Sequence, residues 1–500
     1  MSERVDLLLV NPGGRKDVYQ ALAGEYAAIE PPVWVFLIAA YARGKGLTVE
    51  AIDANAEELT YAETAERVAR ANPRLCAVIV YGHNPSASTQ VMPAAGEITR
   101  LIKGAAPEVP TIMIGGHVAA LPERTFAEEA CDFVCTGEGP VTVVELLGAL
   151  SGKRALEEAR GLIFEKDGAT VKTPPAPLVT DLDGEMGDFA WDLLPMERYR
   201  AHNWHAFGEP SRTPYAAVYT TLGCPFRCNF CCIQAPFKSG EAVMGLSSKA
   251  KSYRMWSPET ILRQIDILVR EYGVKNIKFA DELFVLDKDH VMGICDELVK
   301  RDYGLNIWAY ARVDTLKGMD LEKIRAAGVK WFALGVESAS ERVRGDAVKG
   351  FKKNKIFDAV GEIRKAGIYI GANYIFGLPE DDLQTMGETL ELALELNTEW
   401  ANFNCAMAYP GSALYETAIE EGWELPSTWA GYSQYAYDMK PLPTKYLTPA
   451  QVLAFRDEAF HRYFENPAYL ELVSQRFGAE AREHVLQMTK TRLKRKLLGN

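Results

Sequence analysis

Three cysteines stand close together near the middle of the chain, in the stretch Cys224-Pro-Phe-Arg-Cys228-Asn-Phe-Cys231. They follow an apolar segment, residues 215–221, that is typical of a buried strand. A loop after such a strand can curl three thiolates around one iron–sulfur cluster. Because such clusters normally take four cysteine ligands, a local trio leaves one iron open to a substrate or a cofactor.

The main alternative for this trio is a zinc ion or three structural thiols. Tetrahedral zinc would need a fourth ligand nearby, and the adjacent Cys232 is poorly placed to share one metal with Cys231. The chain has nine cysteines, an odd number, and four of them fall between positions 224 and 232. This distribution suits a metal site in a reduced compartment better than a set of disulfides.

Polar side chains that could serve such a cluster follow the next predicted strands. Asp281 and Glu282 follow one strand, Arg312 follows the next, and Glu337 and Ser338 follow the one after that. Taken singly, an acid at a strand end is more often a helix cap or a solvated surface group. In a parallel barrel, however, all strands direct their carboxyl ends to one rim, so we expect these groups to converge.

Two series of alternating strands and helices must position these groups. The strands of the first series span residues 5–10, 48–53, 76–81, 111–115 and 133–135. This alternation predicts a parallel, doubly wound sheet with a crevice at the carboxyl ends of its strands. The second series, six strand–helix steps between residues 215 and 408, predicts a full or partial β/α barrel of the TIM type.

We therefore predict an α/β protein with four regions. They are a Rossmann-like sheet domain (1–155), a connector with one short strand at 161–165 (156–210), the barrel (211–415) and a helical C-terminal cap (416–500). We expect the first region to fold as an independent domain, and the cap to cover the mouth of the barrel.

Composition and charge narrow the class of protein. The 500 residues are 48% hydrophobic and 24% charged, as in folded globular chains. A net charge of −12 argues against broad attachment to nucleic acid or to anionic lipid. The most apolar run, residues 33–42, is about half as long as a membrane span, and the first residues do not resemble a secretory signal. We expect a cytoplasmic protein that acts on a small molecule.

The spacing C-x₃-C-x-aromatic-C resembles that of the radical S-adenosylmethionine superfamily, over about residues 215–411. The resemblance implies that the three cysteines hold a four-iron, four-sulfur cluster, whose fourth iron is chelated by S-adenosylmethionine. It places Phe230 beside the adenine, Asp281 and Glu282 at the methionyl ammonium, and Glu337, with Ser338, at the ribose hydroxyls. Among these rim residues, we expect Glu282, Arg312 and Glu337 to be the catalytic ones.

Residues 5–152 are similar to the cobalamin-binding domain that is often fused to such barrels. The landmarks of this similarity, which we expect to contact the cofactor, are Asn11, Pro12, Gly115, Gly116, His117, Gly137, Glu138 and Gly139. Glycines at strand ends allow close approach of a planar ligand, although ordinary tight turns also favour them. The loop after the first strand has no histidine, so we expect cobalamin without an axial histidine from that loop. His83 and His117 follow later strands and could approach the corrin, but loop histidines are more often solvated.

The two resemblances together imply a cobalamin-dependent radical S-adenosylmethionine enzyme. We expect a methyltransferase that acts on an unactivated carbon of a small molecule and draws electrons from a flavodoxin or ferredoxin type of donor. A non-methylating relative, such as an oxidative cyclase or a ring-rearranging enzyme, would use the same two domains. A cobalamin or redox sensor is a third possibility, but a sensor would not need the acids at 281, 282 and 337.

Overall fold

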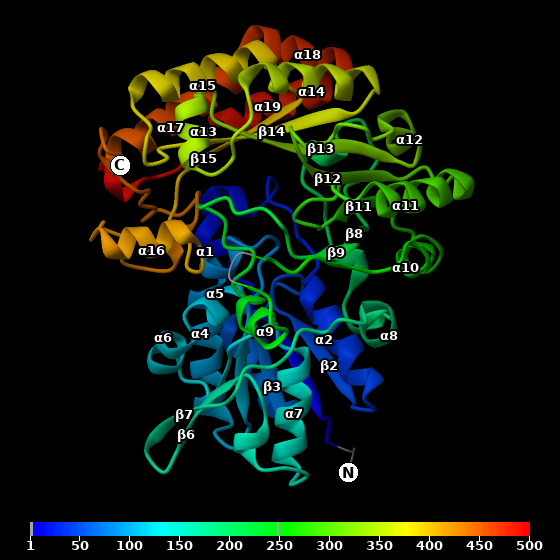
Figure 1. Cartoon of the computed structure of the whole chain (residues 1–500), viewed down its shortest axis with the longest axis vertical. Helices are drawn as coiled ribbons and strands as arrows, with labels where there is room; N and C mark the ends of the chain where they lie inside the picture. Colours follow the sequence, from blue (N-terminus) through cyan, green and yellow to red (C-terminus); the bar gives the residue numbers. More distant parts are fainter. Residues whose placement is uncertain (1–3, 248–249) are drawn as a thin grey trace.

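The computed structural model describes residues 4–247 and 250–500. It consists of two α/β units stacked along the long axis of the molecule, with the N-terminal sheet at one end and the barrel at the other (Figure 1). The fold class predicted from the alternation of strands and helices is confirmed, and helices occupy the C-terminal region. None of the described helices is long and apolar enough to cross a membrane.

The first unit is a seven-stranded sheet of strand order β2-β1-β3-β4-β5-β6-β7. Its parallel strands are β1 (Leu7–Asn11), β2 (Val49–Asp53), β3 (Leu75–Ile79), β4 (Thr111–Ile114) and β5 (Phe133–Cys135). The helices that follow these strands are α2 (Val33–Gly44), α3 (Tyr61–Ala71), α4 (Ala87–Ala105), α5 (Gly116–Ala120), α6 (Pro122–Glu128) and α7 (Pro140–Leu150). The order reverses between β1 and β3, and doubly wound sheets bind ligands at the crevice above such a switch point.

A hairpin of two antiparallel strands, β6 (Leu162–Lys166) and β7 (Ala169–Lys172), extends this sheet beyond β5. The sequence predicts only the first of the two strands, and assigns it to the connector. Three of the four residues of β7 are exposed, so the strand carries no alternation of apolar and polar side chains that could reveal it.

The second unit is a partial barrel of six parallel strands whose order in space follows the sequence. The strands are β8 (Tyr215–Val218), β11 (Asn276–Phe279), β12 (Asn306–Arg312), β13 (Val329–Glu337), β14 (Tyr369–Phe376) and β15 (Trp400–Cys405). The connecting helices are α10 (Pro258–Tyr272), α11 (Lys288–Arg301), α12 (Leu321–Ala326), α13 (Glu341–Asp346), α14 (Lys353–Lys365) and α15 (Leu383–Leu396). A small ribbon, β9 (Thr221–Leu222) with β10 (Arg254–Met255), leads into and out of the cysteine loop.

The barrel is filled with aromatic side chains at the amino ends of its strands. Trp204 of the connector packs edge-on against Trp308 and Trp331, with ring centroids 5.5 and 5.2 Å away. Phe477, from the C-terminal helix α18 (Pro467–Phe477), stacks on Trp331 at 5.5 Å and also touches Tyr369. These helices therefore close the amino end of the barrel, whereas the preceding part of the C-terminal region reaches the carboxyl end of β15, where Gln434 bonds to the backbone of Cys405. The neighbouring helices are α17 (Pro449–Phe464) and α19 (Ala479–Lys490).

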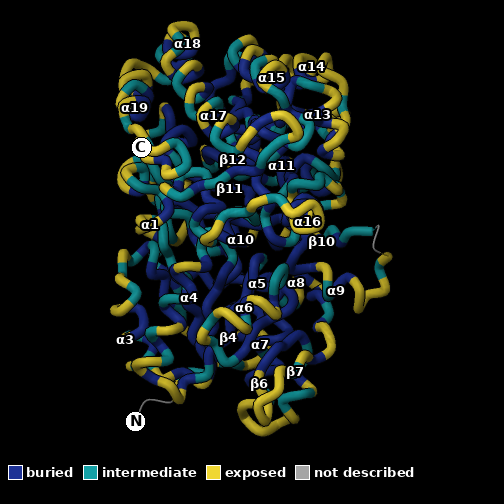
Figure 2. The backbone as a smooth tube through the Cα atoms, turned by 90° about the vertical axis from the view of Figure 1, so that its left-hand side faces the viewer, coloured by how far each residue is buried: buried dark blue, intermediate teal, exposed yellow. Residues whose placement is uncertain are grey.

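Helix α2 packs between the first sheet and the connector (Figure 1), and it is buried along almost its whole length. In the side view, buried backbone continues from one unit into the other (Figure 2). Its residues from Val33 to Ala42 are all buried, and Phe36 packs against Trp191 of the connector with centroids 4.7 Å apart. A helix that is apolar on every side must be covered on every side, which explains the apolar run at 33–42. The same hydrophobic cluster continues from the first sheet through α2 and the connector into the barrel.

Candidate active site

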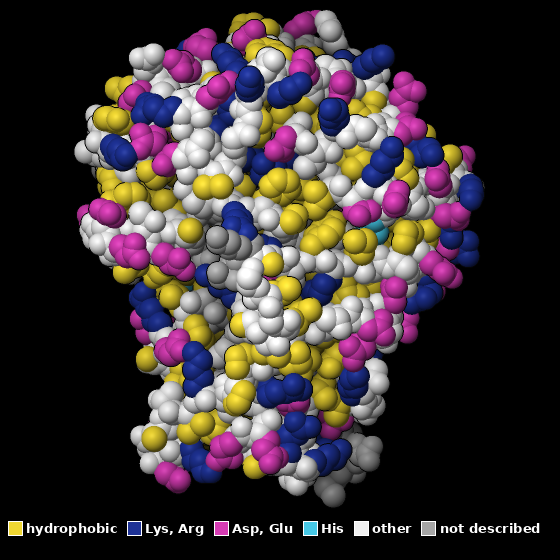
Figure 3. Space-filling model, viewed as in Figure 1, with side chains coloured by type: hydrophobic (Ala, Val, Ile, Leu, Met, Phe, Trp, Pro, Cys, Tyr) yellow, Lys and Arg dark blue, Asp and Glu magenta, His cyan; other side chains and the backbone are white. Residues whose placement is uncertain are grey.

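The carboxyl ends of the two sets of strands face each other, and two neighbouring cavities lie between them, a larger and a smaller one, both partly open to solvent. Residues of both units line each cavity, and the two cavities share Trp34, Tyr81, Gly82 and Tyr219. On the surface, hydrophobic side chains gather in the band where the units meet (Figure 3). The rims predicted from the two series of strands thus border one common space.

The cysteine loop leaves the barrel beside this space. Gly223 precedes it with φ +91°, and a Cβ there would lie 2.3 Å from the carbonyl oxygen of Ser252, so the turn requires glycine. The side-chain Nδ2 of Asn229 donates to the carbonyl of Asp346 at 3.0 Å, and the backbone carbonyl of Asn229 accepts from the backbone amide of Leu414 at 2.8 Å. These bonds fasten the loop to segments that follow β13 and β15.

The three predicted ligands differ in exposure. Cys224 and Cys228 are half-buried and Cys231 is exposed. Burial, the nearby carboxylate of Glu282 and the thiol of Cys228 raise the pKa of Cys224 to about 11. Within residues 4–247 and 250–500, no three cysteine, histidine or acidic groups converge as one metal ion requires. In a four-iron cluster each thiolate binds a different iron, so the three sulfurs need not meet at one point.

The two adjacent acids at the end of β11 have different surroundings. Asp281 is fully buried, and its carboxylate accepts from the hydroxyl and amide of Thr220 (both 2.6 Å) and from the amide of Thr221 (2.8 Å). Glu282 lines the larger cavity, where its Oε2 is buried and has no hydrogen-bond partner among the described residues. Burial raises the pKa of Glu282 well above its usual value. Glu282 is therefore free to receive a ligand, whereas Asp281 holds the corner that leads to the cysteine loop.

Arg312, at the end of β12, lies against the cysteine loop. Its Nη1 is 3.3 Å from Sγ of Cys228, and its guanidinium lies 3.8 Å from the centre of the Phe226 ring. Asp314 accepts from its Nε and Nη2 at 2.9 and 3.0 Å. Arg312 is thus held in one position at the edge of the predicted cluster site.

Glu337 and Ser338 end β13 after an irregularity in its pairing with β14. Glu337 has φ +64°, which is uncommon for a residue with a side chain. Its carboxylate forms a buried ion pair with Lys349. Ser338 is buried, with its Oγ 3.2 Å from Oγ1 of Thr389. Phe230, on the cysteine loop, is half-buried and packs against two small apolar clusters at the barrel rim.

On the first unit, Asn11 and Pro12 end β1 at the facing rim. Asn11 Nδ2 donates to Asp53 Oδ1 at 2.7 Å, and the other oxygen of Asp53 accepts from the hydroxyl of Tyr199 at 2.9 Å. Pro12 is buried beside this group. Asp53 therefore links the ends of β1 and β2 to the connector, and the bond from Asn11 gives that residue a structural role that the sequence does not reveal.

The four glycines at the ends of β4 and β5 fall into two pairs. A Cβ on Gly115 or on Gly139 would lie 2.1 or 2.7 Å from atoms of the first unit itself, so internal packing already requires glycine there. For Gly116 and Gly137 the nearest atoms would be 3.4 and 3.1 Å away. Gly116 also lines the larger cavity, so it is the position at which close approach of a ligand best accounts for glycine.

Two histidines of the first unit lie near the rim, and burial lowers the pKa of both. His117 is buried against Trp429 (ring centroids 4.3 Å apart), with its Nδ1 3.2 Å from Oγ1 of Thr89, and its pKa is lowered to about 3. His83 lines the smaller cavity, and its pKa is lowered to about 4. Both imidazoles are therefore neutral at pH 7, and His117 is enclosed by packing.

Glu138 connects the first unit to the ribbon beside the cysteine loop. Its carboxylate accepts from Arg254 Nη2 at 2.7 Å, from Arg254 Nη1 at 3.3 Å, and from the amide of Val179 at 2.7 Å. Both side chains of the ion pair are less than one-tenth exposed. The sequence predicts a cofactor contact for Glu138; the structure engages its carboxylate in contact between the units.

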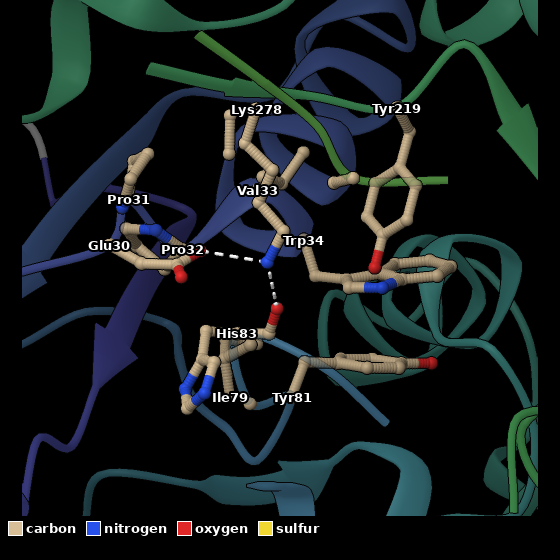
Figure 4. A pocket seen from close by; sticks show the side chains of 13 residues that line it. Glu30, Pro31, Pro32, Val33, Trp34, Ile79, Tyr81, His83, Tyr219 and Lys278 are labelled. Atoms are coloured by element: carbon tan, nitrogen blue, oxygen red, sulfur yellow. Dashed lines mark hydrogen bonds and ion pairs between the residues drawn. The ribbon is translucent and has the colours of Figure 1, made fainter. Parts of the chain in front are cut away.

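A buried ion pair in the smaller cavity is missing from the sequence-based predictions. Lys278 of β11 donates to Glu30 Oε2 at 2.9 Å and to the carbonyl of His83 at 2.6 Å (Figure 4). Although burial alone would raise it, the Lys278 ammonium and a hydrogen bond from His202 hold the pKa of Glu30 well below its usual value. The signal in the sequence is a lysine between the apolar residues Ile277 and Phe279.

Comparison with known proteins agrees with this arrangement. Residues 19–147 match the family model of the B12 binding domain, and residues 218–393 match that of the radical SAM superfamily. The chain is 30% identical to an uncharacterized methyltransferase, PH0819, of Pyrococcus horikoshii, covering 88% of this chain and 89% of the relative. It is 26% identical to the anaerobic magnesium-protoporphyrin IX monomethyl ester cyclase of Rubrivivax gelatinosus, covering 80% and 68%.

Two solved structures share the fold over nearly the whole chain. The radical S-adenosylmethionine methyltransferase TsrM of Kitasatospora setae superposes with a TM-score of 0.69 at 16% identity, covering 97% of this chain and 98% of TsrM. The cobalamin-dependent S-adenosylmethionine radical enzyme OxsB superposes with a TM-score of 0.67 at 17% identity, covering 98% and 71%. The chain therefore belongs to the radical S-adenosylmethionine enzymes that carry a cobalamin-binding domain, and its cofactors are a four-iron, four-sulfur cluster, S-adenosylmethionine and cobalamin.

Proposed function

We propose that this enzyme is a methyltransferase that moves a methyl group from methylcobalamin to an unactivated carbon of a small molecule. The observation that carries the proposal is the common space between the two rims, in which each cavity is lined from both units. When bound, the cluster and S-adenosylmethionine supply an organic radical that removes a hydrogen atom, and cobalamin supplies the methyl group. Both supplies are useful only if the two cofactors and the substrate share one enclosed space.

On the barrel side, the protein binds and orients. Cys224, Cys228 and Cys231 would hold the cluster, and Phe230 would pack against the adenine. The free carboxylate of Glu282 would accept hydrogen bonds from the methionyl ammonium, since an unpartnered buried acid gains most from a cationic donor. Asp281 supports the site indirectly, because its carboxylate holds the backbone of Thr220 and Thr221 in place.

Glu337 and Ser338 complete this side of the site. Glu337, held by Lys349, would offer an oxygen to the ribose hydroxyls, next to the buried Ser338. Arg312 remains beside the cluster ligands. A flavodoxin or ferredoxin type of donor would deliver the electrons that the radical step consumes.

On the cobalamin side, Gly116 offers bare backbone toward the shared space, next to Gly82 and Asn84. Gly115, Gly137 and Gly139 shape the same rim, as do Asn11 and Pro12 at the end of β1. His117 is enclosed and neutral, which supports cobalamin without nitrogen from that residue. The stacked rings of Trp34 and Tyr81, 4.2 Å apart, keep water from the middle of the space.

A second candidate is a non-methylating reaction such as oxidative cyclisation. It is supported by relatives named as anaerobic magnesium-protoporphyrin IX monomethyl ester cyclases, three of which are 25–27% identical to this chain. Both candidates require the same cofactors and the same enclosure. They differ in whether a methyl group leaves S-adenosylmethionine and enters the product.

The deciding experiment follows the methyl group. Metabolites of a deletion strain and its parent are compared by mass spectrometry to find a product that lacks one methyl group in the mutant. The reconstituted enzyme, its substrate, a reductant and methyl-deuterated S-adenosylmethionine should then yield a product with a CD₃ group, together with 5′-deoxyadenosine and S-adenosylhomocysteine in about equal amounts. If 5′-deoxyadenosine forms without label in the product and without S-adenosylhomocysteine, the reaction is cyclisation or rearrangement. If neither 5′-deoxyadenosine nor S-adenosylhomocysteine forms when substrate is present, both candidate reactions are wrong.

A further inference from the structure

Arg312 is held on three sides by groups that surround the cluster site. Its Nη1 approaches Sγ of Cys228 at 3.3 Å, and the face of its guanidinium covers the ring of Phe226, two residues before that cysteine. Its other edge is paired with Asp314 at 2.9 and 3.0 Å. Arg312 is only 8% exposed, so water competes little for its N–H groups.

The contact between Arg312 and the sulfur of Cys228 distinguishes Arg312 from the other charged side chains on the rim. Glu282 and the pair formed by Glu337 and Lys349 are not bonded to a cysteine sulfur among the hydrogen bonds of the described residues. Planar guanidinium groups carry a permanent charge and donate in fixed directions. A thiolate bound to iron keeps lone pairs that accept such a bond, and hydrogen bonds to the sulfurs tune the potential of iron–sulfur clusters.

We propose that Arg312 sets the reduction potential of the cluster by donating an N–H to the sulfur of Cys228. One electron from a low-potential donor, dithionite in the assay, converts the cluster from the 2+ to the 1+ state, with no proton transferred. The reduced cluster carries one more negative charge, so a cation that donates to a ligand sulfur stabilises it more than the oxidised form. Asp314 and Phe226 fix the position of the guanidinium. The role concerns electron entry and holds whether the enzyme methylates or cyclises its substrate.

The test measures the potential of the cluster in the full-length chain loaded with iron, sulfide and cobalamin but without S-adenosylmethionine. Arg312→Gln removes the charge and replaces the guanidinium fork by a shorter, neutral amide, and Arg342→Gln is the matched control, because Arg342 is exposed and pairs with Glu380 and Asp382 on the surface. Redox titration is followed by low-temperature electron paramagnetic resonance of the reduced cluster. At a fixed applied potential, Arg312→Gln should lower the ratio of reduced to oxidised cluster at least tenfold, which corresponds to a shift of about 59 mV for one electron. Arg342→Gln should leave the ratio unchanged.

Iron content and binding of S-adenosylmethionine are measured on the same samples. If Arg312→Gln loads too little iron to titrate, Arg312→Lys is used instead, and the ratio should still fall, by about threefold, because the charge remains but the fixed fork is lost. A wild-type potential in the loaded variants overturns the proposal. So does a variant that keeps the potential but binds S-adenosylmethionine less tightly, since Arg312 would then serve that ligand and not the cluster.

Discussion

The buried ion pair between Glu138 and Arg254 is the contact between the two units whose loss is easiest to quantify. Arg254→Met removes two of the three donors to the Glu138 carboxylate and leaves only the amide of Val179. Hydrogen bonds to charged groups contribute about 1.5–3 kcal/mol each. Because both side chains are less than one-tenth exposed, water cannot replace the lost donors. We expect the change to cost about 3–5 kcal/mol, the usual effect of breaking a buried pair.

The assay should report on this contact and not on global unfolding, because a chain with two units need not unfold in one step. Hydrogen exchange read by mass spectrometry suits the purpose, since the amide of Val179 itself donates to Glu138. If local opening governs exchange, a loss of about 3–5 kcal/mol raises the exchange rate by roughly two to three and a half orders of magnitude. The increase should appear in peptides that cover residues 176–182 and 252–256 of the apoprotein.

Two further variants separate the pair from its surroundings. Lys300→Met removes a surface ion pair in which the Lys300 and Glu297 side chains are 69% and 40% exposed. This change should alter the exchange rates by less than threefold. Replacing both partners of the buried pair, as Glu138→Leu with Arg254→Met, should cost less than Arg254→Met alone, because no charge is left without a partner. Exchange rates in the two peptides that stay within threefold of wild type in Arg254→Met would refute the reasoning.

Three other predictions follow from the site. Glu282→Gln should raise the melting temperature of the ligand-free protein at pH 8, and the gain should shrink toward pH 4. The reason is that burial raises the folded-state pKa of Glu282, so ionisation of this carboxyl destabilises the fold above about pH 4.5. Calorimetry across this pH range checks the prediction, and a difference in melting temperature that stays constant with pH would contradict it. Changing Cys224, Cys228 and Cys231 together to Ala should abolish bound iron but preserve cobalamin, as measured by iron assay and absorbance, and full iron retention would disprove the assignment. Trp34→Ala should join the two cavities and cost about 3–5 kcal/mol in denaturant unfolding, whereas Trp34→Phe should cost distinctly less.

The sequence predicts most strongly where the signal is local. The strands β1 and β3 are runs of buried apolar residues, and the three cysteines act through their own spacing, so both can be found without knowledge of the fold. The strand β7 escapes because its side chains are exposed. The pairing of Glu138 with Arg254 joins positions 116 residues apart, and no local pattern indicates it.

The two adjacent acids that follow β11 differ in a way that the sequence alone does not predict. Asp281 and Glu282 look equivalent as letters, and both are predicted to contact S-adenosylmethionine. Both residues lie beyond Phe279, where β11 ends, so no alternation within a strand fixes the directions of their side chains. In the structure Asp281 is bonded to Thr220, whereas Glu282 lines the cavity. Which of the two is satisfied within the protein depends on what the neighbouring strand presents, and only the three-dimensional structure supplies that.

The burial of α2 on all sides means that the two halves of this enzyme are not interchangeable modules. A fragment that ends near residue 155 would expose Phe36, which packs on Trp191, and Trp34, whose edge faces Tyr219. The fragment that we predict to fold as an independent domain would then carry these apolar side chains on its surface. If this cobalamin-binding half were fused to another barrel, the new partner would need a groove that covers Phe36 and Trp34. Engineering of the two units must therefore preserve the packing of α2 against the connector and the barrel.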